Sequence, residues 1–400
     1  MFFSKSQLTQ VESPLTLIPK CEKCRLYTQC QTPKMKFAGQ GKKEILIVLD
    51  GVAAKDDIAG VPGTGDTKVL FNRYLKPLGI DYDVDCWRVP AVICHSPKVF
   101  MGAAEAERII NSCRPNLINT INELNPKIII VSGSVALKSL LKYLWRKTGE
   151  DTTTQIRWAG WRIPSQQLNA WVCPILNPLQ VAKEKNPLYD FYLKESLKEI
   201  AELDSRPWKK VPDWKSEVQI INDIDDIIKK LKYFKTLPAI SFDYETNCLK
   251  PDNPEGIIYC CSMSDGETTI AFPMKEKVVP YVKDILFDAN IKKSGWNIQF
   301  EDRWTYAKLG QRVRGWDWDG MVNNPLIDNR DDINSLKFQA FVRLGVPIYS
   351  DDTESFLEAD GGYGINRIND AGWSRLLLYN RLDSLLENKI TKIQKKLLGM

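Results

Sequence analysis

The chain of 400 residues has very little histidine and no long apolar run. Its single histidine, His95, lies in the first half, so an active site in the second half has no imidazole of its own. No apolar stretch reaches the roughly 20 residues that a membrane-spanning helix needs. The N-terminal residues also lack the basic-then-apolar pattern of a signal peptide. These absences predict a cytoplasmic protein with no membrane partner, in which the ten cysteines are buried or bind metal rather than form disulfides.

The composition, with 44% hydrophobic and 26% charged residues, is typical of a globular protein. Four hundred residues exceed one ordinary hydrophobic core, which predicts two domains. Residues 204–216 contain prolines and clustered charges without periodicity, as linkers do. The expected division is therefore a first domain over 1–203, a linker over 204–216 and a second domain over 217–400. The first half is mildly basic, which suits contact with a polyanion such as DNA.

The first half alternates between apolar strand-like segments and amphipathic helical ones. Strands are expected at 44–50, 127–132 and 170–176, and helices at 66–78, 103–123, 134–146 and 189–203. This alternation predicts an α/β domain of stacked layers with a mainly parallel sheet.

The second half begins with a helical segment at 222–234, which a set of strand patterns follows. Strands are expected at 238–245, 257–263, 268–272 and 291–296, a helix from 298, and helical segments up to the end of the chain.

Two acidic residues lie on the strand expected at 238–245. Asp243 and Glu245 are two residues apart, so their side chains project from the same face of the strand. Two carboxylates this close repel each other unless a divalent cation lies between them, and Mg²⁺ prefers such oxygen ligands. The alternative is an acidic pair that faces solvent at the end of a strand.

Two further segments carry acidic residues in the same half. Residues 295–302 (GWNIQFED) lead from a strand into a helix, and Tyr379 and Asp383 lie four apart on one face of a later helix. Each segment is common by chance, but the three in this order within one domain are not.

Together these segments resemble the DEDD superfamily of 3′→5′ exonucleases, most closely the tyrosine variant in the proofreading domains of family A DNA polymerases. The resemblance covers roughly 216–400 and implies an RNase H-like fold with a mixed sheet. It also implies two Mg²⁺ or Mn²⁺ ions and a DNA substrate with a single-stranded or frayed 3′ end. The residues that it assigns to catalysis are Asp243, Glu245, Glu301, Tyr379 and Asp383. Asp319-Gly320-Met321 and Ser335-Leu336-Lys337 are similar to structural or substrate-positioning segments of the superfamily.

The resemblance also implies a mechanism. Two divalent ions about 3.5–4 Å apart would activate a water and stabilise the leaving 3′ oxygen. Tyr379 would orient the attacking water, and Asn297 and Phe300 would contact the substrate. Exposed bases would stack on Trp304 or Tyr306, although both rings could equally belong to the core.

The acid after Phe300 departs from the pattern of the superfamily. The usual aspartate is replaced by Glu301, and Asp302 follows, so either residue could be the metal ligand. The alignment favours Glu301, whose longer side chain would shift the metal.

The first half contains a candidate metal site of a different kind. Cys21 and Cys24 form a C-x₂-C pair, and Cys94 and Cys113 could complete a set of four thiolates. Four thiolates favour Zn²⁺ or an iron–sulfur cluster, and free buried cysteines are the alternative.

Residues 45–70, and the order of elements and cysteines over 17–203, resemble the family 4 uracil-DNA glycosylases. The resemblance implies that Cys21, Cys24, Cys94 and Cys113 hold a [4Fe–4S] cluster, whereas Cys30 and Cys86 have no matching role. The active-site residues of the family are absent from this chain. Leu49-Asp50-Gly51-Val52-Ala53 replaces the water-positioning loop, and Gly63, Pro90 and Asn177 stand at the base-stacking, base-reading and catalytic positions. We therefore expect a non-catalytic domain that acts as a scaffold or contacts DNA.

The two resemblances together are typical of phage replication proteins. The sequence ends at Met400, soon after the third acidic segment and without polymerase palm or fingers. We therefore expect a proofreading subunit for a separate family A DNA polymerase, in the host cytoplasm if the chain is phage-encoded. Two alternatives stay open: a catalytically inert structural subunit of a polymerase, and an active uracil-DNA glycosylase fused to a nuclease.

Overall fold

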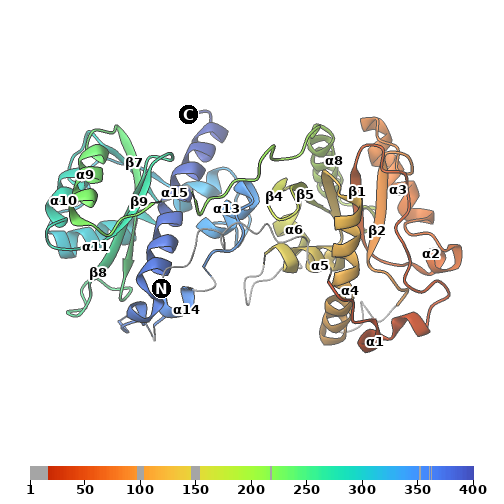
Figure 1. The fold of residues 1–400 in the computed structure, drawn as a ribbon. Helices are drawn as coiled ribbons and strands as arrows, with labels where there is room; N and C mark the ends of the chain where they lie inside the picture. The colour runs from red at the N-terminus through yellow and green to blue at the C-terminus, as the bar shows by residue number, and fades with distance from the viewer. Residues whose placement is uncertain are drawn as a thin grey trace. The chain divides into compact units, whose positions relative to one another are not determined.

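The computed structural model describes residues 17–96, 103–145, 154–216, 219–350, 353–359, 361 and 363–400. The first sixteen residues, in which no signal pattern was found, lie outside the described residues. The chain forms two compact units, Met1–Lys209 and Lys210–Met400 (Figure 1). Among the described helices, none combines the length and the apolar character needed to cross a membrane.

The first unit contains a five-stranded sheet in the order β2-β1-β3-β5-β4. Its strands are β1 (Ile45–Gly51), β2 (Cys86–Val92), β3 (Ile128–Ser132), β4 (Ile163–Ser165) and β5 (Ala170–Ile175). The pairs β1–β2, β1–β3 and β3–β5 are parallel, and only β4 runs antiparallel to its neighbour. The expectation of a mainly parallel sheet is confirmed.

Helices cover both faces of this sheet. They are α1 (Cys21–Cys24), α2 (Ala54–Ala59), α3 (Gly65–Leu75), α4 (Ala103–Leu124), α5 (Ser134–Leu144), α6 (Gln155–Trp158), α7 (Pro178–Glu184) and α8 (Pro187–Ala201). Apolar residues of α3, α7 and α8 form one core with alternate residues of β1, β3 and β5. Helices α4 and α5 contact β1 and β2 and each other, which completes the three layers.

Strand β2 was not expected, because Arg88 and Pro90 interrupt its apolar pattern. It forms at the edge of the sheet, where only one side pairs with β1. A proline is tolerated there because its missing N–H need not serve the ladder.

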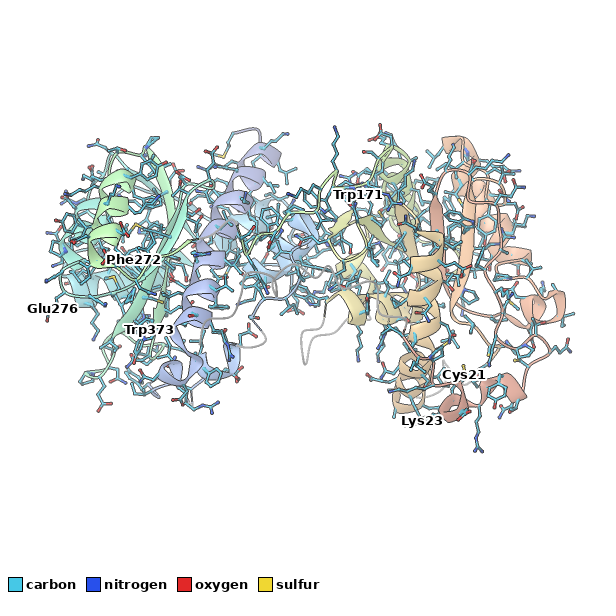
Figure 2. The ribbon with its side chains drawn as sticks, in the orientation of Figure 1. Cys21, Lys23, Trp171, Phe272, Glu276 and Trp373 are labelled. Atoms are coloured by element: carbon cyan, nitrogen blue, oxygen red, sulfur yellow. The ribbon has the colours of Figure 1, made fainter. Side chains whose placement is uncertain are left out.

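The residues after α8 remain attached to the first unit rather than forming a free spacer. Arg206 donates to the carbonyl oxygens of Asn125, Pro126 and Asn169. The indole of Trp171, which Figure 2 labels, donates to the Ser205 carbonyl oxygen at 3.0 Å. The start of the expected linker is therefore fixed by hydrogen bonds.

The second unit contains a six-stranded sheet in the order β11-β10-β7-β8-β9-β6. Its strands are β6 (Gln219–Ile220), β7 (Ala239–Thr246), β8 (Ile258–Ser264), β9 (Thr269–Pro273), β10 (Lys292–Gly295) and β11 (Trp316–Asp319). Strands β7, β8 and β9 form an antiparallel meander, whereas β10 and β11 add in parallel on the other side of β7. This order and these directions are those of the RNase H-like fold that the sequence predicts.

Two sets of helices lie on opposite faces of this sheet. They are α9 (Ile224–Phe234), α10 (Val279–Leu286), α11 (Ile298–Leu309), α12 (Gly320–Asn323), α13 (Leu336–Leu344), α14 (Glu354–Leu357) and α15 (Trp373–Leu397). Helices α9, α10 and α11 share an apolar core with one face, which includes Phe272 (Figure 2). The long α15, blue in Figure 1, packs on β7, β8 and β9 from the other side.

The close approach of α15 to the sheet depends on small buried serines. Ser241 of β7 donates to the Ser384 carbonyl oxygen at 2.7 Å, and Ser262 of β8 donates to the Asn380 carbonyl oxygen at 2.8 Å. On β7, Ile240, Phe242 and Tyr244 face the apolar core. The alternation of the strand therefore turns residues 241, 243 and 245 towards α15.

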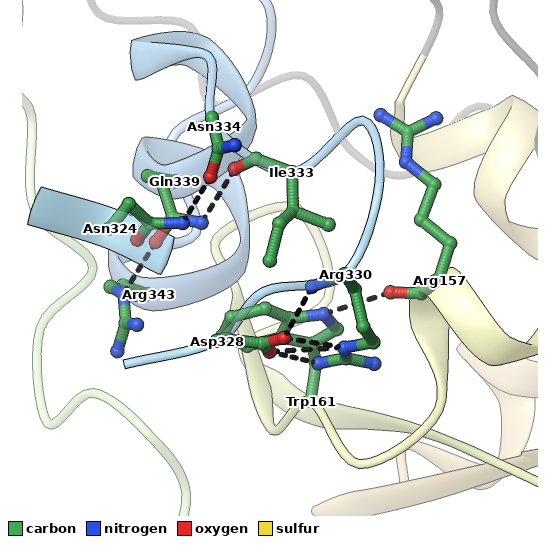
Figure 3. Close-up of polar contacts among 9 residues, drawn as sticks. All are labelled: Arg157, Trp161, Asn324, Asp328, Arg330, Ile333, Asn334, Gln339 and Arg343. Carbon is green, nitrogen blue, oxygen red and sulfur yellow. Dashed lines mark hydrogen bonds and ion pairs between the residues drawn. The ribbon is translucent and has the colours of Figure 1, made fainter. Parts of the chain in front are cut away.

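The segment between β11 and α13 is held by side-chain amides and an ion pair (Figure 3). Asn324 donates to the side chain of Asn334 at 2.7 Å, and Gln339 donates to the Ile333 carbonyl oxygen at 2.7 Å. Arg330 pairs with Asp328 at 2.6 Å. These contacts fix the start of α13, which carries Lys337.

Candidate active site

Three carboxylates meet where β7 faces α15. Asp243, Glu245 and Asp383 each offer an oxygen atom, and these atoms all lie within 4.8 Å of one another. Glu245 and Asp383 are buried, whereas Asp243 is partly exposed. The alternative of a solvent-facing acidic pair is therefore wrong for Asp243 and Glu245.

The three carboxylates open onto a cavity of about 240 Å³. Its lining also includes side chains from the start of α11 and from the loops after β7 and around α14. The lining residues are Asp243, Tyr244, Glu245, Thr246, Cys248, Leu249, Trp296, Asn297, Phe300, Glu301, Leu357, Asn366, Tyr379 and Asp383. The cavity brings together all three acidic segments of the sequence.

Helix α15 places two polar groups against the carboxylates in addition to Asp383. Asn380 donates its amide N–H to Asp243 Oδ2 at 2.7 Å. Tyr379 lines the cavity, and its ring lies 5.9 Å from that of Tyr349. Tyr349 donates its hydroxyl to Asp383. No motif or spacing in the sequence indicated Tyr349, which lies outside any regular element.

Lys337 is the cation of this site. Its Nζ donates to the Tyr379 hydroxyl oxygen at 2.6 Å and pairs with Glu354 at 3.3 Å. The surrounding carboxylates Asp383, Glu354 and Glu245 hold the pKa of Lys337 above its usual value despite burial. The Ser-Leu-Lys segment was the sequence signal for this residue. Ser335 begins α13 by accepting a hydrogen bond from the Phe338 N–H.

Burial and mutual repulsion raise the pKa values of the carboxylates. For Asp243 the causes are burial and then the charge of Asp383, and for Glu245 they are burial and then the charge of Asp243. Burial also raises the pKa of Asp383, although Lys337 opposes the shift. A divalent cation would reverse these shifts, because it favours the ionised carboxylates that coordinate it.

The structure separates the two acids that follow Phe300. Glu301 is 3% exposed and lines the cavity. Asp302 points away: it pairs with Arg312 and accepts from the Val313 N–H at 3.0 Å. The prediction that Asp302 could be the metal ligand is therefore wrong, because its carboxylate binds residues of the loop after α11. Glu301 lies outside the group of three oxygens within 4.8 Å.

The residues that were expected to contact the substrate lie in different environments. Asn297, at the start of α11 with φ +66°, and Phe300 both line the cavity. Trp304 is fully buried in the core, so its assignment as a base-stacking surface is corrected. Tyr306 is 57% exposed, so the core interpretation is wrong for that ring. On a helix, residues two apart do not share a face.

Asp319 organises the start of α11 without reaching the cavity. It accepts from the backbone N–H groups of Asn297 and Ile298 at 3.1 and 3.0 Å. It also accepts from the N–H groups of Met321 and Val322, which begins α12. These bonds agree with the structural role expected from the sequence.

In the first unit, the four expected cysteines line one small cavity. Cys21 and Cys24 come from α1, Cys94 follows β2, and Cys113 lies on α4. Figure 2 labels Cys21 on α1, which contacts α4, and the neighbouring Lys20 N–H donates to the carbonyl oxygen of Ser112 in the middle of α4.

Two of these sulfur atoms accept hydrogen bonds from the backbone. The Lys34 N–H lies 3.4 Å from Cys94 Sγ, and the Ile93 N–H lies 3.4 Å from Cys113 Sγ. Burial raises the pKa of Cys94 to about 11 and that of Cys113 to about 12. These pKa values favour thiols unless a metal holds the thiolates.

The positions that replace the glycosylase residues have structural roles here. A Cβ atom at Gly63 would lie 2.4 Å from the Tyr82 hydroxyl oxygen and 2.8 Å from Leu49 Cδ1. Asn177 begins α7 by accepting from the Leu179 N–H at 2.9 Å. Pro90 is a paired residue of β2 opposite Leu49. The space for an aromatic ring at position 63 is therefore filled.

A second cavity, of about 200 Å³, lies at the carboxyl end of β1 beside Asp50 and Asn177. Asp50 accepts from the N–H groups of Val135 and Ala136 at 2.8 and 3.0 Å. Burial raises the pKa of Asp50 to about 6, although these bonds oppose the shift. His95, whose Nδ1 lies 2.7 Å from the Val52 carbonyl oxygen, is not among the residues that line this cavity.

Comparison with known proteins bears on each unit. No protein-family model matches the chain. The type-4 uracil-DNA glycosylase of Sulfurisphaera tokodaii is 28% identical over 197 residues, which are 48% of this chain and 84% of that protein. The enzyme of the same name from Saccharolobus solfataricus is 26% identical over 192 residues, with 48% of this chain and 85% of that protein covered. The expected resemblance of the N-terminal half to these glycosylases is confirmed.

Solved nuclease structures are similar over 46% of this chain. Escherichia coli RNase D, an exoribonuclease, has a TM-score of 0.37 and 14% identity, and the match covers 45% of that chain. Brucella melitensis NrnC bound to pGG has a TM-score of 0.34 and 16% identity, with 81% of that chain covered. The chain thus spans under half the length of RNase D.

Proposed function

We propose that the second unit is a metal-dependent 3′→5′ exonuclease that acts on DNA. The observation that carries the proposal is the convergence of Asp243, Glu245 and Asp383 within 4.8 Å at the wall of a cavity. A buried cluster of like charges costs free energy unless cations occupy it. Functional sites are where such clusters are retained.

The residues fit a pair of divalent ions. All candidate ligands are hard carboxylate oxygens, the type that Mg²⁺ and Mn²⁺ prefer. Asp243, Glu245 and Asp383 would hold one ion, with Asp243 and Glu301 facing the other. When bound, the ions lower the pKa of the attacking water and neutralise the scissile phosphate and leaving oxygen.

Side chains of the chain would position the substrate and the water. Lys337 donates to the Tyr379 hydroxyl oxygen, so the phenol keeps its own O–H free to donate to Asp383 or to the attacking water. Phe300 and Leu249 line the mouth of the cavity and offer apolar surfaces to a terminal base. Asn297 offers an amide to the sugar–phosphate backbone of the terminal nucleotide.

The burial of the carboxylates favours cleavage at an end. Glu245 and Asp383 are buried and face a cavity rather than the open surface of the unit. We therefore expect a 3′ end that separates readily from its template to reach them more easily, which favours mismatched termini. The resemblance to proofreading domains supports a role as an editing subunit for a separate family A DNA polymerase.

The first unit is proposed to be a non-catalytic iron–sulfur domain that acts as a scaffold or contacts DNA. The convergence of Cys21, Cys24, Cys94 and Cys113 and the resemblance to type-4 glycosylases support a [4Fe–4S] cluster, with Zn²⁺ as the alternative. The filled space at Gly63 supports the loss of glycosylase activity. Incubation with uracil-containing DNA, followed by alkaline cleavage, tests this loss, and abasic sites formed by the pure protein would contradict it.

The nuclease proposal is tested with labelled DNA carrying a mismatched 3′ end, in Mg²⁺ and in EDTA. We expect release of mononucleotides from the 3′ end in Mg²⁺ only, faster for mismatched than for paired ends. An RNA strand of the same sequence decides whether ribose is accepted. The rival interpretation, an inert structural subunit of a polymerase, predicts no release from any of these substrates.

A further inference from the structure

Glu387 is a buried carboxylate that the acidic segments of the sequence do not include. It lies on α15 one turn beyond Asp383 and two turns beyond Tyr379. Residues spaced by four lie on one face of a helix, so Glu387 shares a face with Tyr379 and Asp383, one turn beyond the last residue of α15 that lines the cavity. Its side chain is 2% exposed.

Glu387 and Glu301 share an unusual feature. In each, the Oε2 atom is buried and has no hydrogen-bond partner in the described part of the chain. A buried polar atom without a partner costs on the order of 1–3 kcal/mol, more if the group is charged. Glu301 lines the cavity, and Asp243 and Glu301 are the charged groups that act most strongly on Glu387. The two unpartnered atoms therefore indicate a ligand near both carboxylates.

The charges around Glu387 identify what kind of ligand is missing. Burial, and then the charges of the acidic groups around it, raise the pKa of Glu387 well above its usual value; these groups are Asp243, Glu301, Asp383 and Asp319.

Lys337 acts on the other carboxylates of the cluster. Lys337 lowers the pKa values of Asp243, Glu245 and Asp383 and so offsets part of their repulsion. For Glu301, the charged neighbours that act on it are Asp243 and Asp319, again both acidic. Positive charge from Lys337 therefore offsets part of the repulsion among Asp243, Glu245 and Asp383, whereas the charged groups that act on Glu301 are both acidic.

We propose that Glu387 is a fifth carboxylate of the metal centre, which with Glu301 serves a divalent cation beside Asp243. Glu387 would coordinate the ion directly or accept from its water ligands. The inference rests on the proposed function, because it assumes that the cluster binds divalent ions. The proposed role of Glu387 also accounts for the longer side chain at position 301. Glu387 would add a third carboxylate to Asp243 and Glu301 around this ion, which compensates for the shifted position of the Glu301 carboxylate.

The test measures Mn²⁺ binding to the full chain by two methods. One is titration calorimetry, and the other is the loss of the electron paramagnetic resonance signal of free Mn²⁺. We expect Glu387→Gln, which keeps the shape and removes the charge, to weaken one Mn²⁺ site by about 10–100-fold, as for other residues that support metal ligands. Glu387→Asp, which restores the charge, should recover part of the affinity. The matched control is Asp302→Asn, an acid next to Glu301 that pairs with Arg312 outside the cavity. It should bind Mn²⁺ as the wild type does.

Thermal unfolding gives a second readout that is independent of activity. In EDTA, Glu387→Gln should melt above the wild type, because on folding the wild type must either protonate this carboxyl or bury its charge. The rise in melting temperature on adding Mn²⁺ should be smaller for Glu387→Gln than for the wild type. Unchanged Mn²⁺ affinity at both sites in Glu387→Gln would overturn the inference.

A further variant separates this failure from that of the proposed function. Asp243→Asn should weaken both ions. Loss of Mn²⁺ in Asp243→Asn together with wild-type binding in Glu387→Gln refutes only the role of Glu387. Wild-type binding in Asp243→Asn refutes the metal centre itself.

Discussion

Replacing Lys337 with methionine should lower turnover while making the metal ions easier to bind. The substitution keeps the length of the side chain and removes the ammonium that donates to the Tyr379 hydroxyl oxygen at 2.6 Å. A hydrogen bond from a charged donor contributes about 1.5–3 kcal/mol. At about 1.4 kcal/mol for each factor of ten, its loss in the transition state lowers kcat by about 10–150-fold.

The effect on metal affinity has the opposite sign. In the wild type, the positive charge of Lys337 repels a divalent ion that approaches Asp383 and Glu245. These two carboxylates also raise the pKa of Lys337. Without this cation, the Mg²⁺ concentration for half-maximal activity should fall. A residue with a purely structural role would not change kcat and metal affinity in opposite directions.

The assay is mononucleotide release from DNA with a mismatched 3′ end over a Mg²⁺ titration. Lys337→Arg should retain part of the turnover, because it keeps the charge. Lys395→Met is the matched control, since Lys395 pairs with Asp317 away from the cavity, and it should behave as the wild type does. An unchanged kcat in Lys337→Met, or a higher Mg²⁺ requirement, would refute the reasoning.

Three other changes give distinct outcomes. The pKa of Asp50 is raised from 3.8 to about 6 in the folded chain, so the wild type loses stability as the pH rises through this range. The unfolding free energy of Asp50→Asn relative to the wild type should therefore increase by about 3 kcal/mol between about pH 3 and about pH 7 and then level off. Chemical denaturation measures this, and a difference in unfolding free energy between Asp50→Asn and the wild type that does not change with pH would contradict the prediction. Tyr349→Phe removes the hydroxyl that donates to Asp383, so we expect kcat in the nuclease assay to fall about tenfold, and an unaltered rate counts against that contact. Cys94→Ser should abolish a brown colour with absorbance at about 400 nm in protein purified without oxygen. Cys86→Ser should keep the colour, because Cys86 belongs to the apolar core of the first unit, and a colourless wild type that contains zinc would replace the iron–sulfur assignment.

The layered organisation of both units could be predicted from periodicity because most strands carry uninterrupted apolar patterns. Residues 128–132 are isoleucine, valine and serine, all buried between two helical layers. Strand β2 was missed because Arg88 and Pro90 break that pattern, and only its place at the sheet edge makes the proline acceptable. Strand β11 was missed because four residues with alternating aromatic and acidic side chains are too short to show a period.

The site could be predicted where its residues lie at fixed spacings on one element. Asp243 and Glu245 on a strand, and Tyr379 and Asp383 on a helix, face one way because the backbone geometry requires it. The sequence could not decide between Glu301 and Asp302, since adjacent residues on a helix differ by about 100° in direction and only the packing of α11 shows which one faces the cavity.

The remaining site residues depend on tertiary packing. Tyr349 reaches Asp383 from a segment without regular structure, and the charge of Asp243 acts on Glu387 only because α15 packs against β7. Trp304 and Tyr306, which a sequence treats alike, are separated by the face of α11 that packs on the sheet. None of these contacts follows from local spacing.

The most direct test of the central claim is nucleotide release from a mismatched 3′ end by the wild type and by Asp243→Ala, each in Mg²⁺ and in EDTA. The account predicts stepwise removal from the 3′ end by the wild type in Mg²⁺ alone, and none by the variant. Digestion that persists in EDTA or in Asp243→Ala, or a wild type that removes nothing, would contradict it.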